Sequence, residues 1–287
     1  MLPTSIIALV SARYEKGPTS EVELCAIISE FHASTTHEVT MADRRGARGP
    51  HPKDEDCFDD DQLLRLRRGV ADLSWLRSRG YSSKAALDLV GNRYALRDRQ
   101  RIALQRCAAG DEECRQREMR RVADSALEGA TLVVDGYNVL LTLEAALSGG
   151  VLLRARDGAF RDLAAMSAHY RRLRVTRPAI GLVRDHLERR GCERVLWYLD
   201  SPVSNSGRLK GIIEAAVAGS KAAWEVRLIK QVDRAVATSP HIVATADSAI
   251  LDRCSRWFNL ARSIVEQSVP EAWIVDLGGV SGRRDCS

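Results

Sequence analysis

The sequence predicts an α/β protein, in which a mostly parallel β-sheet flanked by helices follows a small all-α region. From about residue 129 onward, apolar β-branched runs alternate with helical patterns, which is typical of parallel strands joined by crossover helices. Upstream of this, apolar residues recur at steps of three and four, which is typical of amphipathic helices. Apolar residues make up 45% of the chain and charged residues 28%, the composition of a globular protein with its own core.

Changes in pattern divide the 287 residues into four segments. We expect residues 1–60 to form a disordered or weakly ordered extension, because much of this segment mixes Gly, Pro and charges without a hydrophobic period. Met41 is an alternative start of the chain. The other expected segments are a basic, helix-turn-helix-like module at 61–128, the α/β domain at 129–279 and a tail at 280–287.

Three short helices are expected in the basic module. The first begins near Gln62 and ends at Gly80, the second begins at the serines before Lys84 and closes at Gly91, and the third occupies residues 96–108. Arginines gather around the second and third helices, which suits contact with a phosphate backbone, although a solvated helix face gives the same pattern. The candidate nucleic-acid contacts here are Arg93, Arg97 and Arg101.

Five runs have the character of buried strands in the α/β domain. Helical patterns at 177–190 and 206–218 lie between them, each followed by glycine. The runs are "TLVVD" (131–135), "RVLWYLD" (194–200), "WEVRLI" (224–229), "HIVATAD" (241–247) and "AWIVDL" (272–277).

Aspartates end three of these runs, at Asp135, Asp200 and Asp247, and Asp252 follows on the next helix. In a parallel sheet the carboxyl ends of the strands meet at one edge, where ligands bind. Four carboxylates there would raise one another's pKa values, and a divalent cation relieves the repulsion. Hard oxygen ligands favour Mg²⁺ or Mn²⁺ over zinc. Each aspartate taken alone can equally be a helix cap or a solvated helix residue.

Other residues are candidate accessories to this edge. Asn138 is placed to hydrogen-bond a carboxylate or a phosphate, and Gly136 would let the backbone approach a metal or phosphate closely. The stretch "SPVSNSGRLK" opens a helix whose free N–H groups can bind an anion, although Ser206 can also act as a plain cap. Its candidate nucleic-acid contacts are Ser204, Asn205, Ser206, Arg208 and Lys210. The weaker candidate acids are Glu144, Asp157 and Asp162, while Asp276 is interpreted as structural.

Two motifs resemble those of a known family. "LVVDGYNVL" resembles the first strand of PIN-like nuclease domains, especially their NYN branch, and "VATADSAILD" resembles a later PIN-type strand. From about residue 62 to 277 the chain also resembles an uncharacterised prokaryotic family that joins a PIN-like domain to a small helical domain with the signature "RGYxxKxALxLVGNRY". That signature here spans Arg79 to Tyr94.

The resemblance implies a metal-dependent nuclease that cuts RNA more readily than DNA. The resemblance implies Mg²⁺ or Mn²⁺ as cofactor. The sequence departs from the family pattern because it offers no clear helix acid between Asp135 and Asp200. The implied catalytic residues are Asp135, Asn138, Asp200, Asp247 and Asp252, of which the four aspartates would hold the metal.

Two alternatives stay open at this point. The first is a nucleic-acid-binding protein whose PIN-like domain does not cut, and the second is a phosphatase or phosphotransferase. The second is weaker because such enzymes commonly carry Asp-x-Asp after the first strand, where this chain has Tyr137 and then Asn138. A GxGxxG dehydrogenase fingerprint and a GxSxG serine-hydrolase motif are both missing from the sequence.

Composition also bears on location and partners. No stretch approaches the roughly 18 apolar residues of a membrane helix, and "SIIALV" near the N-terminus is too short for a signal-peptide core. We therefore expect a cytoplasmic protein with a nucleic acid, rather than a membrane, as partner, and a homodimer is compatible with the sequence. The seven cysteines are scattered singly, which favours reduced structural thiols.

Overall fold

The computed structural model describes residues 49–163 and 174–279. The chain divides into two units, at 1–46 and 47–287, and the structure described here lies within the second. The expected extension and Met41 therefore lie largely outside the described residues, as does the tail at 280–287.

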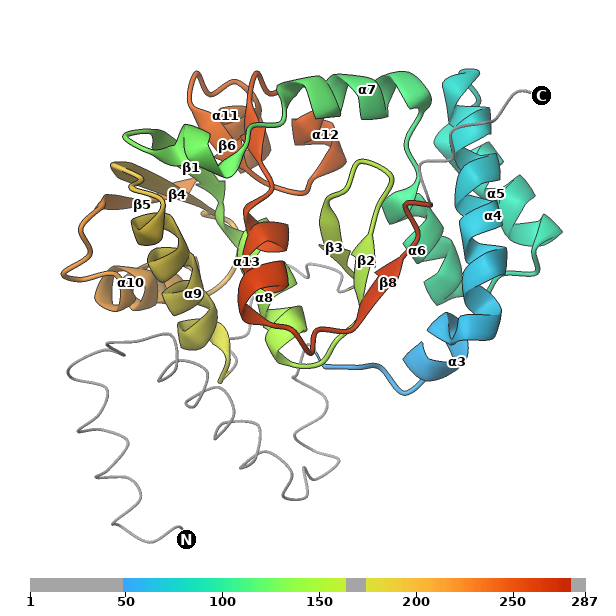
Figure 1. Cartoon of the computed structure of the whole chain (residues 1–287), viewed down its shortest axis with the longest axis horizontal. Helices are drawn as coiled ribbons and strands as arrows, with labels where there is room; N and C mark the ends of the chain where they lie inside the picture. The colour runs from blue at the N-terminus through green and yellow to red at the C-terminus, as the bar shows by residue number, and fades with distance from the viewer. Residues whose placement is uncertain (1–48, 164–173, 280–287) are drawn as a thin grey trace, which may run out of the picture. The chain divides into compact units, whose positions relative to one another are not determined.

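A helical region opens the described chain (Figure 1). Asp59 caps its long helix by accepting a hydrogen bond from the Gln62 N–H, and Ser82 caps the next helix in the same way. Gly80 ends the long helix with φ +79°, as predicted. The helices are α3 (Asp54–Phe58), α4 (Asp60–Ser78), α5 (Ser83–Arg93), α6 (Asp98–Cys107) and α7 (Asp111–Arg120), followed by the 3₁₀ turn η2 (Asp124–Leu127).

Two expectations for this region were wrong. Residues 54–60 do not belong to a weakly ordered extension, because they form α3 and the start of α4, and buried Asp54 is bound by Arg99 at 2.6 Å. Gly91 does not close α5, which continues to Arg93. A Cβ at Gly91 would lie 2.1 Å from Nη1 of Arg101, so this glycine makes room for a side chain of α6.

A five-stranded, all-parallel sheet forms the centre of the α/β domain and confirms the predicted fold class. Its strand order is β5-β4-β1-β6-β7, so β1 lies between the strands that end near Asp200 and Asp247. The strands are β1 (Thr131–Asp135), β4 (Arg194–Asp200), β5 (Ala223–Ile229), β6 (Ile242–Ala244) and β7 (Trp257–Phe258).

Helices cover both faces of this sheet (Figure 1). Neighbouring residues of β1 point to opposite faces, so Val134 packs with α8, α9, α10 and α13, while Val133 packs with α11 and α12. Both valines are fully buried, which explains why the run reads as continuously apolar. The helices are α8 (Gly136–Leu147), α9 (Thr176–Arg189), α10 (Ser206–Ala216), α11 (Val232–Ala237), α12 (Ser248–Leu251) and α13 (Leu260–Ser268).

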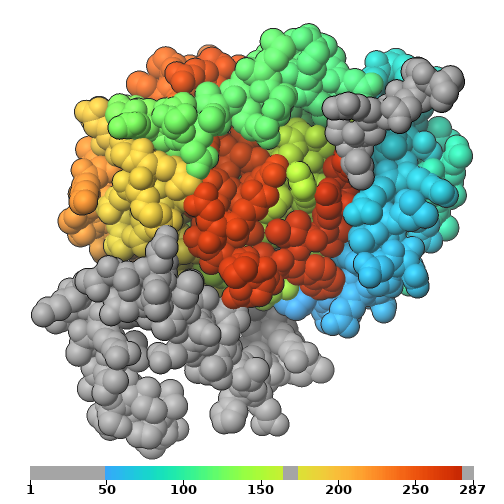
Figure 2. Space-filling view, in the orientation of Figure 1, coloured from blue at the N-terminus to red at the C-terminus, as the bar shows by residue number. Residues whose placement is uncertain are grey.

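The alternation of strands and helices suggested that the last apolar run would join the main sheet, but it does not. It forms β8 (Ile274–Asp276), which pairs with β2 (Leu152–Arg154) in a three-stranded sheet that also contains β3 (Phe160–Asp162). Leu153 and Val275 pack against the helical region, and Figure 2 shows the C-terminal segments beside its blue helices. This small sheet therefore connects the helical region to the α/β domain through a shared core.

Two further observations concern the described residues as a whole. Their five cysteines are free thiols, as expected. No helix in the described ranges combines the length and apolarity needed to cross a bilayer.

Candidate functional site

Three of the predicted aspartates meet at the carboxyl edge of the main sheet. Asp135 ends β1, Asp200 ends the adjacent β4, and Asp247 follows β6 on the other side of β1. The charges of Asp200 and Asp247 both raise the pKa of Asp135, so both carboxyl groups lie within electrostatic reach of Asp135. We call this group, together with Asp233 described below, the acid edge.

Asp135 is the most perturbed member of the acid edge. Only 7% of the residue is exposed, and its Oδ2 accepts a hydrogen bond from Oγ1 of Thr245 at 2.8 Å. Burial raises the pKa of Asp135 to about 7, and the neighbouring charges of Asp247, Asp233 and Asp200 add to this rise, whereas the Thr245 hydrogen bond opposes it. Near neutral pH this carboxyl group is therefore present in both its protonated and its ionised form.

Asp233 is an acid that the sequence analysis missed. It lies in the first turn of α11, a few residues beyond the end of β5, and its charge raises the pKa values of both Asp135 and Asp200. Burial is the largest cause of the raised pKa of Asp200, which the backbone N–H of Val232 partly offsets. The signal for Asp233 in the sequence is its position shortly after the strand-like run "WEVRLI", because the carboxyl ends of parallel strands meet at one edge.

Asp247 is both a member of the acid edge and a helix cap. Its Oδ1 accepts hydrogen bonds from the N–H groups of Ala249 at 2.7 Å and Ile250 at 3.2 Å. The capping interpretation is therefore correct for this residue. It does not displace Asp247 from the edge, since the charge still acts on Asp135.

Asn138 and Thr245 hold the acid edge in place. Oδ1 of Asn138 accepts a 2.7 Å hydrogen bond from the Ala246 N–H, which ties α8 to the loop after β6. Oγ1 of Thr245 accepts from the Asp247 N–H at 3.0 Å and donates to Asp135. These bonds connect β1, α8 and the start of α12, and they give Asn138 a positioning role within the protein. Thr245 was not among the predicted site residues.

Gly136 has a different role from the one expected. A Cβ at this position would lie 2.2 Å from Nε1 of Trp197 and 2.5 Å from the backbone oxygen of Tyr198. The glycine therefore permits α8 to begin hard against β4, directly after Asp135. The close approach that requires glycine in the structure is that of the neighbouring strand β4.

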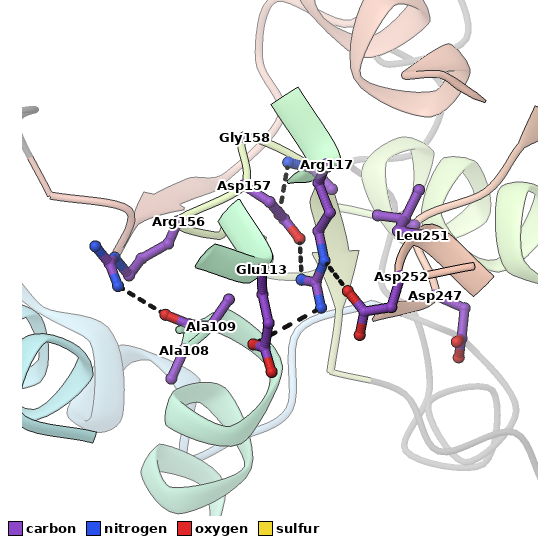
Figure 3. A network of polar contacts seen from close by, with 12 residues as sticks. Ala108, Ala109, Glu113, Arg117, Arg156, Asp157, Gly158, Asp247, Leu251 and Asp252 are labelled. Atoms are coloured by element: carbon purple, nitrogen blue, oxygen red, sulfur yellow. Dashed lines mark hydrogen bonds and ion pairs between the residues drawn. The ribbon is translucent and has the colours of Figure 1, made fainter. Parts of the chain in front are cut away.

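Asp252 lies in a separate network of ion pairs (Figure 3). Its Oδ1 accepts a 2.7 Å hydrogen bond from Nε of Arg117, whose Nη1 donates to Oδ2 of buried Asp157, also at 2.7 Å. Arg161 binds both oxygens of Asp157 at 3.0 and 2.6 Å. We call these four residues the Arg117 network. The structure thus brings Asp252 to Arg117, and Asp247, labelled in the same view, lies apart from the dashed contacts.

The Arg117 network anchors α7 to the α/β domain. Arg117 is buried, and its backbone oxygen accepts a 2.7 Å hydrogen bond from Nε1 of Trp257 in β7. Arg120 adds a 2.8 Å hydrogen bond to the backbone oxygen of Asp252. Sequence reasoning missed this anchor because "DEECRQREMR" has the composition of a solvated helix, and its partners lie far along the chain.

The three weaker candidate acids each contact side chains outside the acid edge. Asp157 belongs to the Arg117 network. Glu144 is fully buried on α8 and accepts a 2.5 Å hydrogen bond from Oγ1 of Thr176 at the start of α9. Asp162 lies on β3, where Oγ1 of Thr142 is 3.4 Å from its Oδ2. Asp276 is within 3.4 Å of Arg154 on β2, which agrees with a structural role.

The predicted anion-binding stretch begins α10, just after Asp200. Asn205 occupies the N-cap position, with φ +69° and no side-chain capping bond, and Ser206 is the first residue of the helix rather than its cap. Oγ of Ser206 instead donates to the backbone oxygen of Ser201 at 3.4 Å. Arg208 is exposed and Lys210 lies 3.6 Å from Glu214.

The candidate arginines of the helical region are engaged to different degrees. Arg101 binds the backbone oxygen of Leu96 at 3.0 Å and Oδ1 of Asn92 at 2.8 Å, which makes it part of the helix packing. Arg93 and Arg97 form longer ion pairs, at 3.8 and 3.7 Å, and their side chains are 70% and 56% exposed. Within the signature, Gly91 is thus explained by its packing against Arg101.

The donor set of the acid edge suits a hard divalent cation. Carboxylate oxygens are the ligands that Mg²⁺ and Mn²⁺ prefer, and the leading charges around buried Asp135 are other carboxylates. Among residues 49–163 and 174–279, no three acidic, histidine or cysteine side chains are grouped tightly enough to chelate an ion as they stand. Oδ1 of Asp247 is engaged in capping α12.

Comparison with known proteins gives two family matches. Residues 124–263 match the "Domain of unknown function (DUF5616)" and residues 65–120 match the "Protein of unknown function (DUF434)". The boundary between the two falls between α7 and η2. No solved structure matches the chain.

A curated relative matches about two thirds of this chain. The "Uncharacterized protein MJ0935" of Methanocaldococcus jannaschii is 30% identical over 190 residues, which cover 66% of this chain and 89% of the relative. Coverage of that extent at this identity implies common descent of the two chains over most of the relative. The chain therefore belongs to the same protein family as MJ0935.

Proposed function

We propose that the acid edge binds Mg²⁺ or Mn²⁺ and hydrolyses phosphodiester bonds, in RNA more readily than in DNA. The observation that carries this proposal is Asp135, a buried carboxyl group whose pKa is raised to about 7 by burial and by three neighbouring aspartates. Such an arrangement costs stability, and perturbed carboxyl groups of this kind concentrate at functional sites.

Asp135, Asp200 and Asp247 would hold the cation, with Asp233 as a further carboxylate nearby. A bound divalent cation supplies positive charge that activates water and stabilises charge on phosphate oxygens. Thr245 holds one oxygen of Asp135, and Asn138 fixes the loop that carries Asp247. In the net reaction water adds across a P–O ester bond and leaves one phosphate end and one hydroxyl end.

The start of α10 supplies a place for the phosphate backbone. The helix begins at Ser206, six residues after Asp200, and Arg208 is exposed in its first turn. Arg93 and Arg97 are the exposed arginines of the helical region that remain candidates for contact with nucleic acid, whereas Arg101 is assigned to packing. The formal net charge of +5 favours a polyanionic partner.

The test uses purified protein with labelled single-stranded RNA and single-stranded DNA, in Mn²⁺, in Mg²⁺ and in EDTA. Asp135→Asn is the test variant, and Asp88→Asn, on an exposed position of α5, is the matched control. We expect metal-dependent cleavage by the wild type and the control, faster on RNA, and its loss in Asp135→Asn.

Three outcomes would contradict the proposal. Uncut RNA with a gel shift that Asp135→Asn retains would favour the non-catalytic binding protein. Phosphate release from a monoester without strand cleavage would favour a phosphatase. Cleavage that survives in Asp135→Asn would place the activity elsewhere in the preparation or the protein.

A further inference from the structure

The outer edge of β5 offers an open line of backbone groups. β5 pairs with β4 on one side, and within the described ranges no strand pairs with its other side (Figure 1). The N–H of Ala223 donates to Glu193, and the backbone oxygen of Ile229 accepts from Ser201, so the odd-numbered residues of β5 direct their backbone groups toward β4. Because direction alternates along a strand, the even-numbered residues direct theirs toward the open edge.

Partly apolar side chains accompany this open edge. A groove beside β5 is lined by strand residues 224–229 and by Lys210 and Glu214 of α10. Leu228 is 41% exposed, which is unusual for a leucine on a strand of a buried parallel sheet. The groove thus combines apolar side chains of the strand with two charges of each sign.

The charges on the opposite face of β5 are self-complementary about Val226. Glu225 and Arg227 flank Val226, and within one chain they are joined by a 2.7 Å ion pair. If a second β5 lies antiparallel with its Val226 opposite this one, each Glu225 faces an Arg227 of the other copy. Trp224 of one copy then faces Leu228 of the other.

The hydrogen-bond direction agrees with the same register. In this register Val226 lies opposite Val226 of the other copy, and the N–H and C=O groups of each point toward the other strand. Trp224 and Leu228 lie opposite each other with the same backbone direction. Glu225 and Arg227 fall on non-hydrogen-bonded pairs, in which facing side chains lie closest. Backbone direction, charge and apolar contact therefore select a single register.

We propose that two copies of this chain associate through antiparallel pairing of their β5 edges, centred on Val226, to form one continuous sheet. The two acid edges then lie at opposite ends of the joined strands and stay open. This inference does not rest on the proposed nuclease activity, since it uses no residue of the acid edge. Charged side chains can also protect an edge strand from pairing, and the experiment separates the two roles.

The experiment measures self-association of the full chain by analytical ultracentrifugation up to high micromolar concentration. We expect a dimer for the wild type. Glu225→Arg and Arg227→Glu each place like charges opposite one another, so each should weaken the dimer at least about tenfold. An equimolar mixture of the two variants should recover a dimer, because both facing pairs are then of opposite charge.

A backbone variant tests the same register independently. Leu228→Pro removes an N–H that is directed to the open edge, which an edge strand tolerates in the monomer, and should abolish the dimer while circular dichroism stays unchanged. A wild type that stays monomeric would overturn the proposal and assign Glu225 and Arg227 to protecting the edge. A dimer that neither charge variant weakens, or a mixture that fails to associate, would also overturn it.

Discussion

Asp135 and Asp157 have the same side chain and the same exposure, 7% of each residue, but opposite electrostatic surroundings. Asp157 faces Arg117 and Arg161, which overcome the cost of burial and lower its pKa to about 2. Asp135 faces Asp247, Asp233 and Asp200, which add to the cost of burial and raise its pKa to about 7. Burial alone therefore does not decide the charge of an aspartate here; the neighbouring charges do.

The comparison separates a structural site from a candidate functional one. In the Arg117 network each carboxylate has a guanidinium partner within 2.7 Å, and the network joins α7 to the α/β domain. At the acid edge the protein gathers like charges with no such compensation among the leading influences on Asp135. A protein retains such an arrangement most readily when a ligand completes it.

Removing Arg117 should give the largest effect on stability. Arg117→Gln leaves Asp157 buried with one guanidinium partner in place of two, so we expect a loss of about 3–5 kcal/mol in the free energy of unfolding, measured with urea. Arg115→Gln, on the same helix but paired only with exposed Glu112, is the matched control and should change little. Equal effects of the two variants would remove the distinction between a buried anchor and a surface ion pair.

Asp135→Asn should stabilise the protein near neutral pH. The folded-state pKa of Asp135 is raised, so the folded protein keeps a proton that the unfolded chain loses, and wild-type stability falls as pH rises from about 4 to about 7. Asparagine removes this penalty and should add roughly 2–4 kcal/mol above pH 7, with no gain below about pH 4. Urea unfolding at both ends of this window measures the difference. A variant less stable than wild type at pH 8 would contradict the assignment.

Asp157→Asn should have the opposite sign. The folded-state pKa of Asp157 is lowered, so its contribution is present above about pH 4 and is lost as the pH falls through about 2. The variant should lose at least about 2 kcal/mol at pH 7, and its deficit should shrink in acid. If the difference from wild type in the free energy of unfolding changed with pH in the same direction in Asp157→Asn and Asp135→Asn, the opposite electrostatic surroundings of the two aspartates would be contradicted.

Asp252→Asn should have the smallest effect of the four. Its side chain is 38% exposed, so solvent screens the ion pair with Arg117, and we expect a loss of about 1 kcal/mol or less. Because Asp252 is directed to Arg117, nuclease activity should persist in this variant. Complete loss of cleavage with normal stability would instead return Asp252 to the metal site that the family resemblance implied.

The parts of the site that sequence predicted are those governed by local rules. Asp135, Asp200 and Asp247 each end an apolar run, and parallel strands bring such ends together whatever the details of packing. The helices α4, α9 and α10 followed in the same way from three-to-four spacing and from the glycine that follows each of them.

The parts that sequence missed depend on contacts between distant segments. Arg117 and Asp252 are 135 residues apart, and nothing in a charge-rich helix distinguishes a buried arginine from a solvated one. Strands β2, β3 and β7 are too short to show a period, so the last apolar run was placed in the wrong sheet. The need for glycine at position 136 comes from Trp197 on the neighbouring strand, a contact that the local sequence does not specify.

The most direct test of the account is Mn²⁺ binding measured by isothermal titration calorimetry at pH 8, where Asp135 is ionised. The wild type and Asp88→Asn should bind the ion, and Asp135→Asn should bind it at least about tenfold more weakly, because the buried carboxylate no longer supplies charge. Equal affinity in Asp135→Asn, or no binding by the wild type, would contradict the claim that these like-charged aspartates are kept together for a cation.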